Sequence, residues 1–123
     1  HITAAVPVES MLPAVAQGAI GIEIRGDDED TAALIAPMND KTTALCVTAE
    51  RAFLATLEGS CRTPIAGLAR LEGGTLTFKG ETLSPDGRLQ VVSTKTGPAS
   101  AAVDLGVTVA DDILSRGGRE VLQ

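Results

Sequence analysis

Aromatic side chains are nearly absent from this chain of 123 residues, which has no Trp, no Tyr and only two Phe, Phe53 and Phe78. Hydrophobic residues still make up 44% of the sequence, which excludes an intrinsically disordered chain. Ala, Val, Leu and Ile must therefore fill the core, so we expect helices and strands to approach one another closely. The length suits one domain of ordinary size.

Basic residues and long apolar runs are also scarce. Ten Lys and Arg stand against sixteen Asp and Glu, giving a formal net charge of −6. Because nucleic-acid binding needs clustered basic side chains, we exclude a nucleic acid as a partner. The longest uncharged stretch, residues 10–22, is interrupted by Pro13 and Gln17 and is too short to cross a membrane. The start of the chain does not resemble a signal peptide.

Histidine and cysteine are too few for a metal centre. The only histidine is His1, the cysteines are Cys46 and Cys61, and no CxxC pattern occurs. We therefore expect no bound metal and two free thiols in a reducing cytoplasm. A chain that begins with His1 instead of Met suggests a tag remnant or a piece of a longer protein.

The first part of the chain predicts a strand without a partner. Ile20, Ile22 and Ile24 alternate with Gly or charged residues, a period of two that is typical of a strand with one buried face. No other segment pairs with this orphan strand in the predicted pattern. We therefore assign residues 1–26 to a preceding, absent domain and residues 27–123 to a C-terminal domain. In this chain, we expect the orphan strand to pair with a second copy.

Two helices are predicted before residue 60. The first follows the acidic run at residues 27–30, which suits a first helical turn, and ends at Pro37. The second is capped by Asn39 or Asp40 and stopped by Gly59. Its apolar face comprises Leu45, Ala49, Ala52, Phe53 and Leu57, with Cys46 beside them as a small core residue.

Three strands and a final helix follow. Alternation over residues 64–71, 75–84 and 88–96, separated by the turn sequences EGG and PDG, predicts an antiparallel meander. The last helix begins near Pro98 and ends at a Gly-Gly pair. The predicted fold class is α+β, with a three-stranded antiparallel sheet, helices packed on one face and the orphan strand in front.

A cysteine lies on the turn between the second helix and the first strand of the sheet. The run LEGSCRTPI at residues 57–65 presents Cys61 among small residues, a position suited to a nucleophile or a covalent attachment point. An ordinary loop cysteine is the alternative, because no partner histidine accompanies it. Glu58 reads as a solvated or capping acid, and Glu50 and Arg51 read as structural, since adjacent helical residues do not face each other.

Several separated runs resemble the C-terminal part of the porphobilinogen deaminase (hydroxymethylbilane synthase) family. They are LPAVAQGAIGIE at residues 12–23, TAERAFL at 48–54, the run at 57–65, PDG at 85–87 and the closing segment 110–122. The resemblance implies a three-domain transferase of tetrapyrrole (haem) biosynthesis. Such an enzyme adds porphobilinogen units to a covalent dipyrromethane cofactor, with loss of ammonia, and releases hydroxymethylbilane.

The resemblance also implies roles for particular residues. Cys61 matches the cysteine that holds dipyrromethane through a thioether, and Gln17 and Gly18 match a stretch close to that cofactor. Ala16 and Ser60 stand where the family usually has Gly. The family's catalytic aspartate and most of its substrate-binding arginines belong to domains that nothing here matches, so we expect no catalytic residue in this chain and no activity from it alone.

Two alternatives to an enzyme fragment remain open. One is a non-catalytic interaction module that has an ordinary loop cysteine and assembles through its exposed strand. The other is a thiol-based redox protein, which the absence of a nearby resolving cysteine disfavours.

Overall fold

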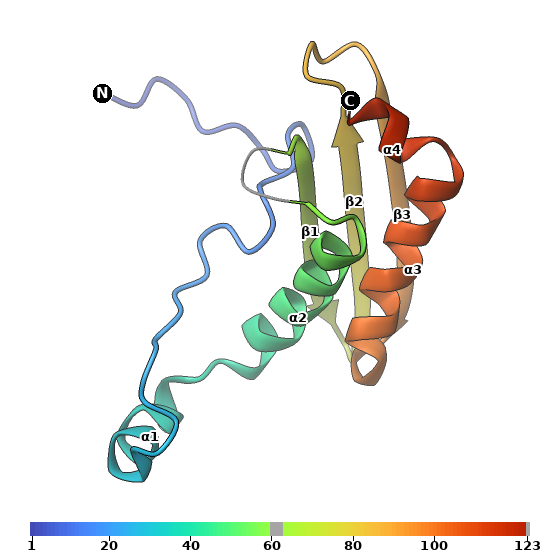
Figure 1. The fold of residues 1–123 in the computed structure, drawn as a ribbon. Helices are drawn as coiled ribbons and strands as arrows, with labels where there is room; N and C mark the ends of the chain where they lie inside the picture. Colours follow the sequence, from blue (N-terminus) through green and yellow to red (C-terminus); the bar gives the residue numbers. More distant parts are fainter. Residues whose placement is uncertain (60–62, 123) are drawn as a thin grey trace.

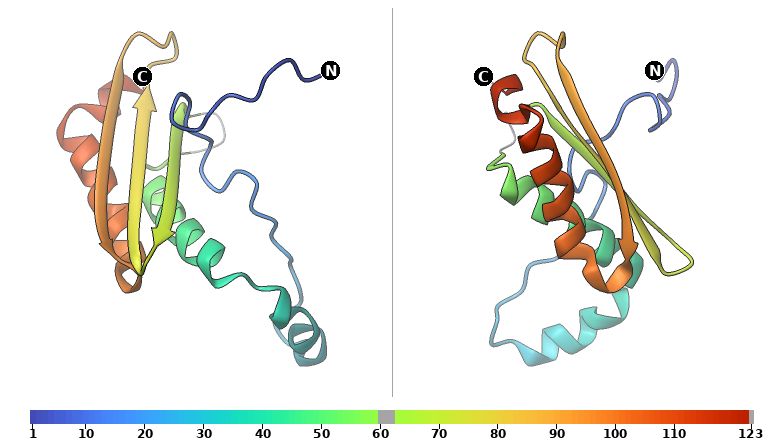
Figure 2. Two further views of the ribbon diagram at one scale, coloured as in Figure 1. Left: turned by 180° about the vertical axis from the view of Figure 1, so that it is seen from behind. Right: turned by 90° about the vertical axis from the view of Figure 1, so that its right-hand side faces the viewer.

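The computed structural model describes residues 1–59 and 63–122. In chain order the elements are α1 (Glu29–Ile35), η1 (Ala36–Met38), α2 (Lys41–Thr56), β1 (Ile65–Glu72), β2 (Thr75–Leu83), β3 (Gln90–Pro98), η2 (Ala99–Ala101), α3 (Ala102–Ser115) and α4 (Gly118–Val121). Helices α2 and α3 lie side by side on one face of the sheet (Figures 1 and 2). The predicted α+β class is confirmed.

The sheet is an antiparallel meander in the order β1-β2-β3. Its strands begin and end within two residues of the predicted bounds. Gly73 and Gly74 make the first turn, and both have positive φ (56° and 81°), which is the conformation that tight hairpin turns require. Residues 8–12 lie against the other face of the sheet, where Glu9 pairs with Arg70 at 2.8 Å, while the N-terminus extends away from it (Figure 2).

The only two aromatic rings meet at the centre of the core. Phe53 from α2 and Phe78 from β2 pack edge to face, with ring centroids 5.0 Å apart, and both are fully buried. Glycines make room for them: a Cβ on Gly80 would lie 2.6 Å from Phe53 Cζ, and one on Gly67 would lie 2.9 Å from Phe78 Cζ. The close approach expected from the composition is therefore found between α2 and the sheet.

The two long helices also approach each other closely. A Cβ on Gly106 of α3 would run into the backbone oxygen of Ala49 and would lie 3.0 Å from Ala52 Cβ on α2. The backbones of the helices thus meet without a side chain between them, which fixes α2 firmly in the domain.

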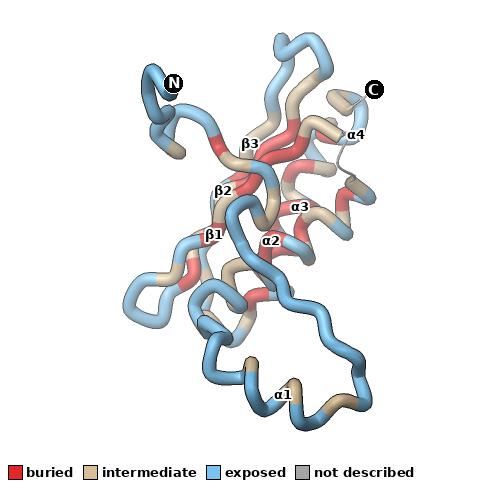
Figure 3. Tube along the Cα trace, turned by 90° about the vertical axis from the view of Figure 1, so that its left-hand side faces the viewer, coloured by how far each residue is buried: buried red, intermediate tan, exposed pale blue. Residues whose placement is uncertain are grey.

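The acidic run before α1 and the predicted cap of α2 act as expected. Asp28 accepts the Thr31 N–H at 3.0 Å, and Asp40, not Asn39, accepts the Thr43 N–H at 2.6 Å. These hydrogen bonds lower the pKa of both carboxyl groups. Helix α1 has no buried residue, and it projects away from the sheet at the end of an exposed connection (Figure 3).

The predicted orphan strand does not form. Residues 19–25 have no regular secondary structure, and Ile20 is 92% exposed (Figure 3). The physical reason is that a strand needs a second strand to satisfy its backbone groups, and within the described residues the sheet contains only β1, β2 and β3. A smaller correction concerns Pro98, which ends β3, whereas α3 begins at Ala102.

Replacing Gly106 with Ala tests the close approach of the two helices. Ala has the higher helix propensity, but its methyl group would collide with the backbone of α2, which cannot rotate aside. We expect Gly106→Ala to lower the free energy of unfolding by about 1–3 kcal/mol in chemical denaturation. Gly97→Ala is the control, since its Cβ would lie 3.7 Å from the nearest atom, Leu105 Cδ1. Equal stability of Gly106→Ala and the parent would contradict the packing described.

Candidate functional site

The connection that carries Cys61 runs from the end of α2 to the start of β1. Cys61 itself lies outside the described residues, as do Ser60 and Arg62. On the α2 side, the Glu58 N–H donates to the Ala55 oxygen at 3.1 Å and the Gly59 N–H donates to the Leu54 oxygen at 3.0 Å. This pair of bonds is the Schellman helix ending.

Gly59 is needed at the helix end, but for a different reason from the one expected. The left-handed residue is Glu58 (φ 55°), whereas Gly59 is the residue after it. A Cβ on Gly59 would lie 2.5 Å from Leu54 Cδ1 and 2.7 Å from Ile65 Cδ1, so the backbone is wedged between the two side chains. On the other side of the connection, the Leu83 N–H donates to the Pro64 oxygen at 2.9 Å. Both ends of the connection are therefore fixed to the domain.

Glu58 is solvated, as the sequence suggested, and it also pairs with the C-terminal helix. Its carboxylate lies 2.9 Å from Nη1 of Arg119 in α4, with both side chains more than half exposed. Exposed ion pairs contribute about 0–1 kcal/mol. The pair links α4 to the end of α2 and adds little to the stability of the domain.

Gln17 and Gly18 follow a segment that packs along the outer edge of β1. The Gly67 N–H donates to the Pro13 oxygen at 3.0 Å, and Leu12 is buried. This part of residues 1–26, which the sequence assigned to a preceding domain, therefore packs against β1 in the chain itself. Gln17 is exposed, and its Oε1 accepts the Ala14 N–H at 3.0 Å. Its predicted contact with a cofactor stays a prediction.

Glu50 is a buried residue whose contacts the sequence did not reveal. Its side chain points from α2 toward β1, and the residue is only 5% exposed. Oε2 accepts the Ala16 N–H at 2.7 Å and Oε1 accepts the Ala69 N–H at 2.9 Å. The predicted structural role is thus correct but incomplete. The sequence did contain one sign of these contacts. Glu50 lies four residues after Cys46 and seven before Leu57, which places this acidic side chain on the buried face of the helix.

Ala16, which Glu50 holds, has a left-handed backbone with φ 58°. For a residue with a Cβ this conformation costs about 1–2 kcal/mol. The family resemblance gives Gly at this position, and the observed conformation explains that preference. The next glycine, Gly18, also has a positive φ (84°) and open space around it.

Cys46, the cysteine that the structure describes, is a partly buried residue of α2. Burial raises the pKa of its thiol, and the nearby Glu50 carboxylate acts in the same direction, against a hydrogen bond from the backbone of Leu71. A thiol with a raised pKa is a poor nucleophile at neutral pH. Cys46 therefore fills space, as the sequence predicted.

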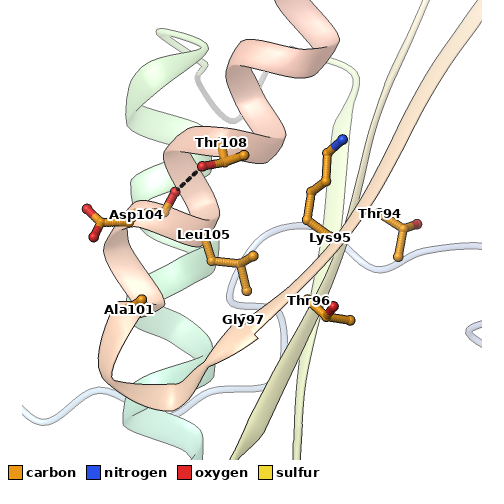
Figure 4. Close-up of a pocket in the computed structure, with 8 residues that line it drawn as sticks. All are labelled: Thr94, Lys95, Thr96, Gly97, Ala101, Asp104, Leu105 and Thr108. Atoms are coloured by element: carbon orange, nitrogen blue, oxygen red, sulfur yellow. Dashed lines mark hydrogen bonds between the residues drawn. The ribbon is translucent and has the colours of Figure 1, made fainter.

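Two surface hollows are lined by residues from separate elements. One, of about 540 Å³, lies between residues 16–22 and α2 and includes Gly18, Met38 and Arg51. The other, of about 470 Å³, lies between β3 and α3, where Lys95 and Leu105 flank it and Asp104 points away (Figure 4). Within residues 1–59 and 63–122, no group of three or more His, Cys, Asp or Glu is placed to hold a metal ion. No helix of this described part is long and apolar enough to span a bilayer.

These features define a small α+β domain that is joined by a buried carboxylate to a flanking segment without regular structure. Residues 44–115 match the family model described as porphobilinogen deaminase, C-terminal domain. Residues 1–33 match the model described as porphobilinogen deaminase, dipyromethane cofactor binding domain. The chain belongs to the porphobilinogen deaminase family, a family of tetrapyrrole biosynthesis, and the resemblance found in the sequence is confirmed.

Two curated relatives are similar over almost the whole chain. Porphobilinogen deaminase from Paracoccus denitrificans (strain Pd 1222) is 52% identical over 112 residues, which is 91% of this chain and 36% of that protein. Porphobilinogen deaminase from Roseiflexus sp. (strain RS-1) is 46% identical over 112 residues, which is 91% of this chain and 37% of that protein. The chain thus spans about a third of the length of the curated relatives it matches.

Replacing Ala16 with Gly tests the left-handed backbone beside Glu50. Gly adopts positive φ without strain, so we expect Ala16→Gly to raise the free energy of unfolding by about 1 kcal/mol. The control is Ala14→Gly, at a residue without a positive φ, which we expect to be neutral or slightly destabilising. A loss of stability in Ala16→Gly, measured by thermal or chemical unfolding, would count against this geometry.

Proposed function

We propose that the protein containing this chain assembles porphobilinogen into hydroxymethylbilane, and that Cys61 carries its dipyrromethane cofactor. The observation that carries this proposal is the match of residues 44–115 to the C-terminal domain of the family, with a cysteine on the connection between α2 and β1. When bound, the cofactor supplies the pyrrole end to which new units are added. No catalytic residue is assigned to this chain.

Three features of the domain support Cys61 as the attachment point. The connection that contains Cys61 is fixed at both ends, by the Schellman bonds at Gly59 and by the bond from Leu83 to Pro64. The other cysteine, Cys46, is a constituent of α2 with a raised pKa. Gly59, at the root of the connection, packs closely against the side chains of Leu54 and Ile65. A cofactor attached to this connection would therefore start from a fixed position on the domain.

Gln17 and Gly18 are our candidates for non-covalent contacts with the cofactor. The side-chain oxygen Oε1 of Gln17 already accepts the Ala14 N–H. The side-chain NH₂ group is therefore the donor that Gln17 would offer to a cofactor carboxylate. Gly18 presents backbone with nothing within 4 Å of where a Cβ would stand, so a ligand can approach it closely.

The net charge of −6 bears on what this chain does alone. Porphobilinogen and the growing pyrrole chain carry carboxylates, which an acidic chain repels. We propose that residues 1–26 belong to a preceding domain, and that the domains preceding this one supply the positive field and the catalytic groups. We also place the protein in the cytoplasm, where both thiols stay reduced.

A second proposal concerns residues 20–24 when the chain is isolated. Ile20, Ile22 and Ile24 are 92%, 50% and 38% exposed. Such an alternating apolar segment favours pairing with another strand, so the isolated chain would self-associate as an interaction module does. Sedimentation as a monomer at high concentration would exclude this.

Intact mass spectrometry tests the attachment site. We expect the purified full-length protein to carry the mass of two linked pyrrole units, which Cys61→Ala abolishes because the thioether sulfur is gone. Cys46→Ala is the matched control and should keep the added mass. The proposal fails if Cys61→Ala retains the pyrrole units or if Cys46→Ala loses them.

Activity measurements test the contribution of the charge. A polypeptide of these 123 residues should produce no hydroxymethylbilane from porphobilinogen, because the cationic side chains needed to hold the carboxylates are not gathered in it. The assay follows ammonia release and product absorbance, with the full-length protein as the positive control. Turnover by the 123-residue chain would refute the assignment of catalysis to other domains.

A further inference from the structure

Glu50 holds together two parts of the chain that are far apart in sequence. Its two oxygens bond to the N–H groups of Ala16, 34 residues earlier, and Ala69, 19 residues later. In the part of the chain that the structure describes, none of the ion pairs involves Glu50. A buried carboxylate that bonds to backbone donors is an anchor for the backbone, because each charged hydrogen bond is about twice as strong as a neutral one.

We infer that Glu50 is a positioning residue, which fastens the segment that bears Gln17 and Gly18 to α2 and thereby fixes it relative to the Cys61 connection. This inference rests on the proposed function of Cys61, Gln17 and Gly18. The two anchored parts share one helix, since Glu50 lies within α2 and the connection leaves from its end at Thr56.

The strained backbone at Ala16 supports the inference independently. A residue with a Cβ keeps a φ of 58° only where its surroundings hold it there. The neighbouring turns depend on it, because the Ala19 N–H donates to the Ala16 oxygen at 3.2 Å and the Gln17 N–H donates to the Ala14 oxygen at 3.0 Å. Without the carboxylate, Ala16 returns to a negative φ, and Gln17 and Gly18 turn away from their present directions.

The position of Glu50 calls for a side chain with two acceptor oxygens. The Ala69 N–H is an outward donor on the edge of β1, next to the Gly67 N–H that Pro13 satisfies. The carboxylate thus satisfies the sheet edge and the flanking segment at once. A glutamine has one acceptor oxygen, and its NH₂ group would face an N–H donor, so it satisfies one partner and repels the other.

The experiment compares Glu50→Gln with the parent in the intact protein by amide hydrogen exchange. We expect exchange at Ala16, at Ala69 or at both to accelerate by about tenfold, while the Phe78 amide in the middle of the sheet is unchanged. Glu72→Gln, at the exposed end of β1, is the matched control and should change neither amide. Glu50→Asp keeps the charge with a shorter reach, and should fall between the parent and Glu50→Gln.

A second substitution tests the coupling to Ala16. In the parent, Ala16→Gly should slow exchange of the residue 16 amide by about fivefold, because the anchored conformation is no longer strained. In the Glu50→Gln background the same change should have no effect or the opposite one. An equal effect in both backgrounds would show that Glu50 does not hold Ala16, and would overturn the inference.

Two readouts separate this inference from the proposed function. Exchange does not depend on a cofactor, so unchanged Ala16 and Ala69 amides in Glu50→Gln overturn the inference whatever Cys61 carries. The added pyrrole mass in the parent reports on the proposed function alone. With both in place, Glu50→Gln should lower cofactor loading or kcat by about tenfold at unchanged Phe78 exchange. Full loading and full kcat would reduce Glu50 to a structural residue and overturn the positioning role.

Discussion

The fold depends on how closely α2 approaches α3 and the sheet. With two aromatic rings in the whole chain, the layers are held by small residues, and glycines stand wherever a side chain would keep them apart. Gly106 lets the helices touch backbone to backbone, and Gly80 receives the Phe53 ring. Interiors packed in this way resist displacement, since any movement opens a gap or creates a collision. Helix α2 is therefore held on two sides, by α3 and by the sheet.

Both features on which our proposals rest are attached to this helix. Its buried face carries Glu50, which holds the flanking segment, and its C-terminus leads through Glu58 and Gly59 into the connection that contains Cys61. A covalently tethered group can reach a defined position only if its attachment point is fixed, because movement of that point adds to the flexibility of the tether. A rigid helix with an anchored end meets that requirement without any contribution from the connection itself.

The sequence predicted those parts of the structure that periodicity determines. Alternation located the three strands, and helical spacing located Phe53 and its neighbours, because each pattern reports one buried face. The same alternation misled at Ile20, Ile22 and Ile24, since period two reports a face to be buried and says nothing of whether a partner strand exists in the chain. The bonds of Glu50 were beyond prediction for another reason: backbone N–H groups, such as that of Ala16, are present at every position and leave no mark in the sequence. Likewise, tertiary packing placed a Glu at the left-handed position where local preference expects Gly.

The two edges of the sheet show why residues 20–24 are the segment to consider for association with another strand. The edge of β1 is occupied by the Pro13 oxygen and the Glu50 carboxylate. At the edge of β3, an Nη atom of Arg116 donates to the Val92 oxygen at 2.5 Å, and Lys95 lies 3.6 Å from Asp112. Charged side chains and occupied backbone groups discourage pairing at an edge. The alternating isoleucines have no such protection, and our proposal that residues 1–26 belong to a preceding domain gives them a sheet to join there. The flanking segment is therefore attached to the domain through Glu50, and its exposed isoleucines remain available to another strand.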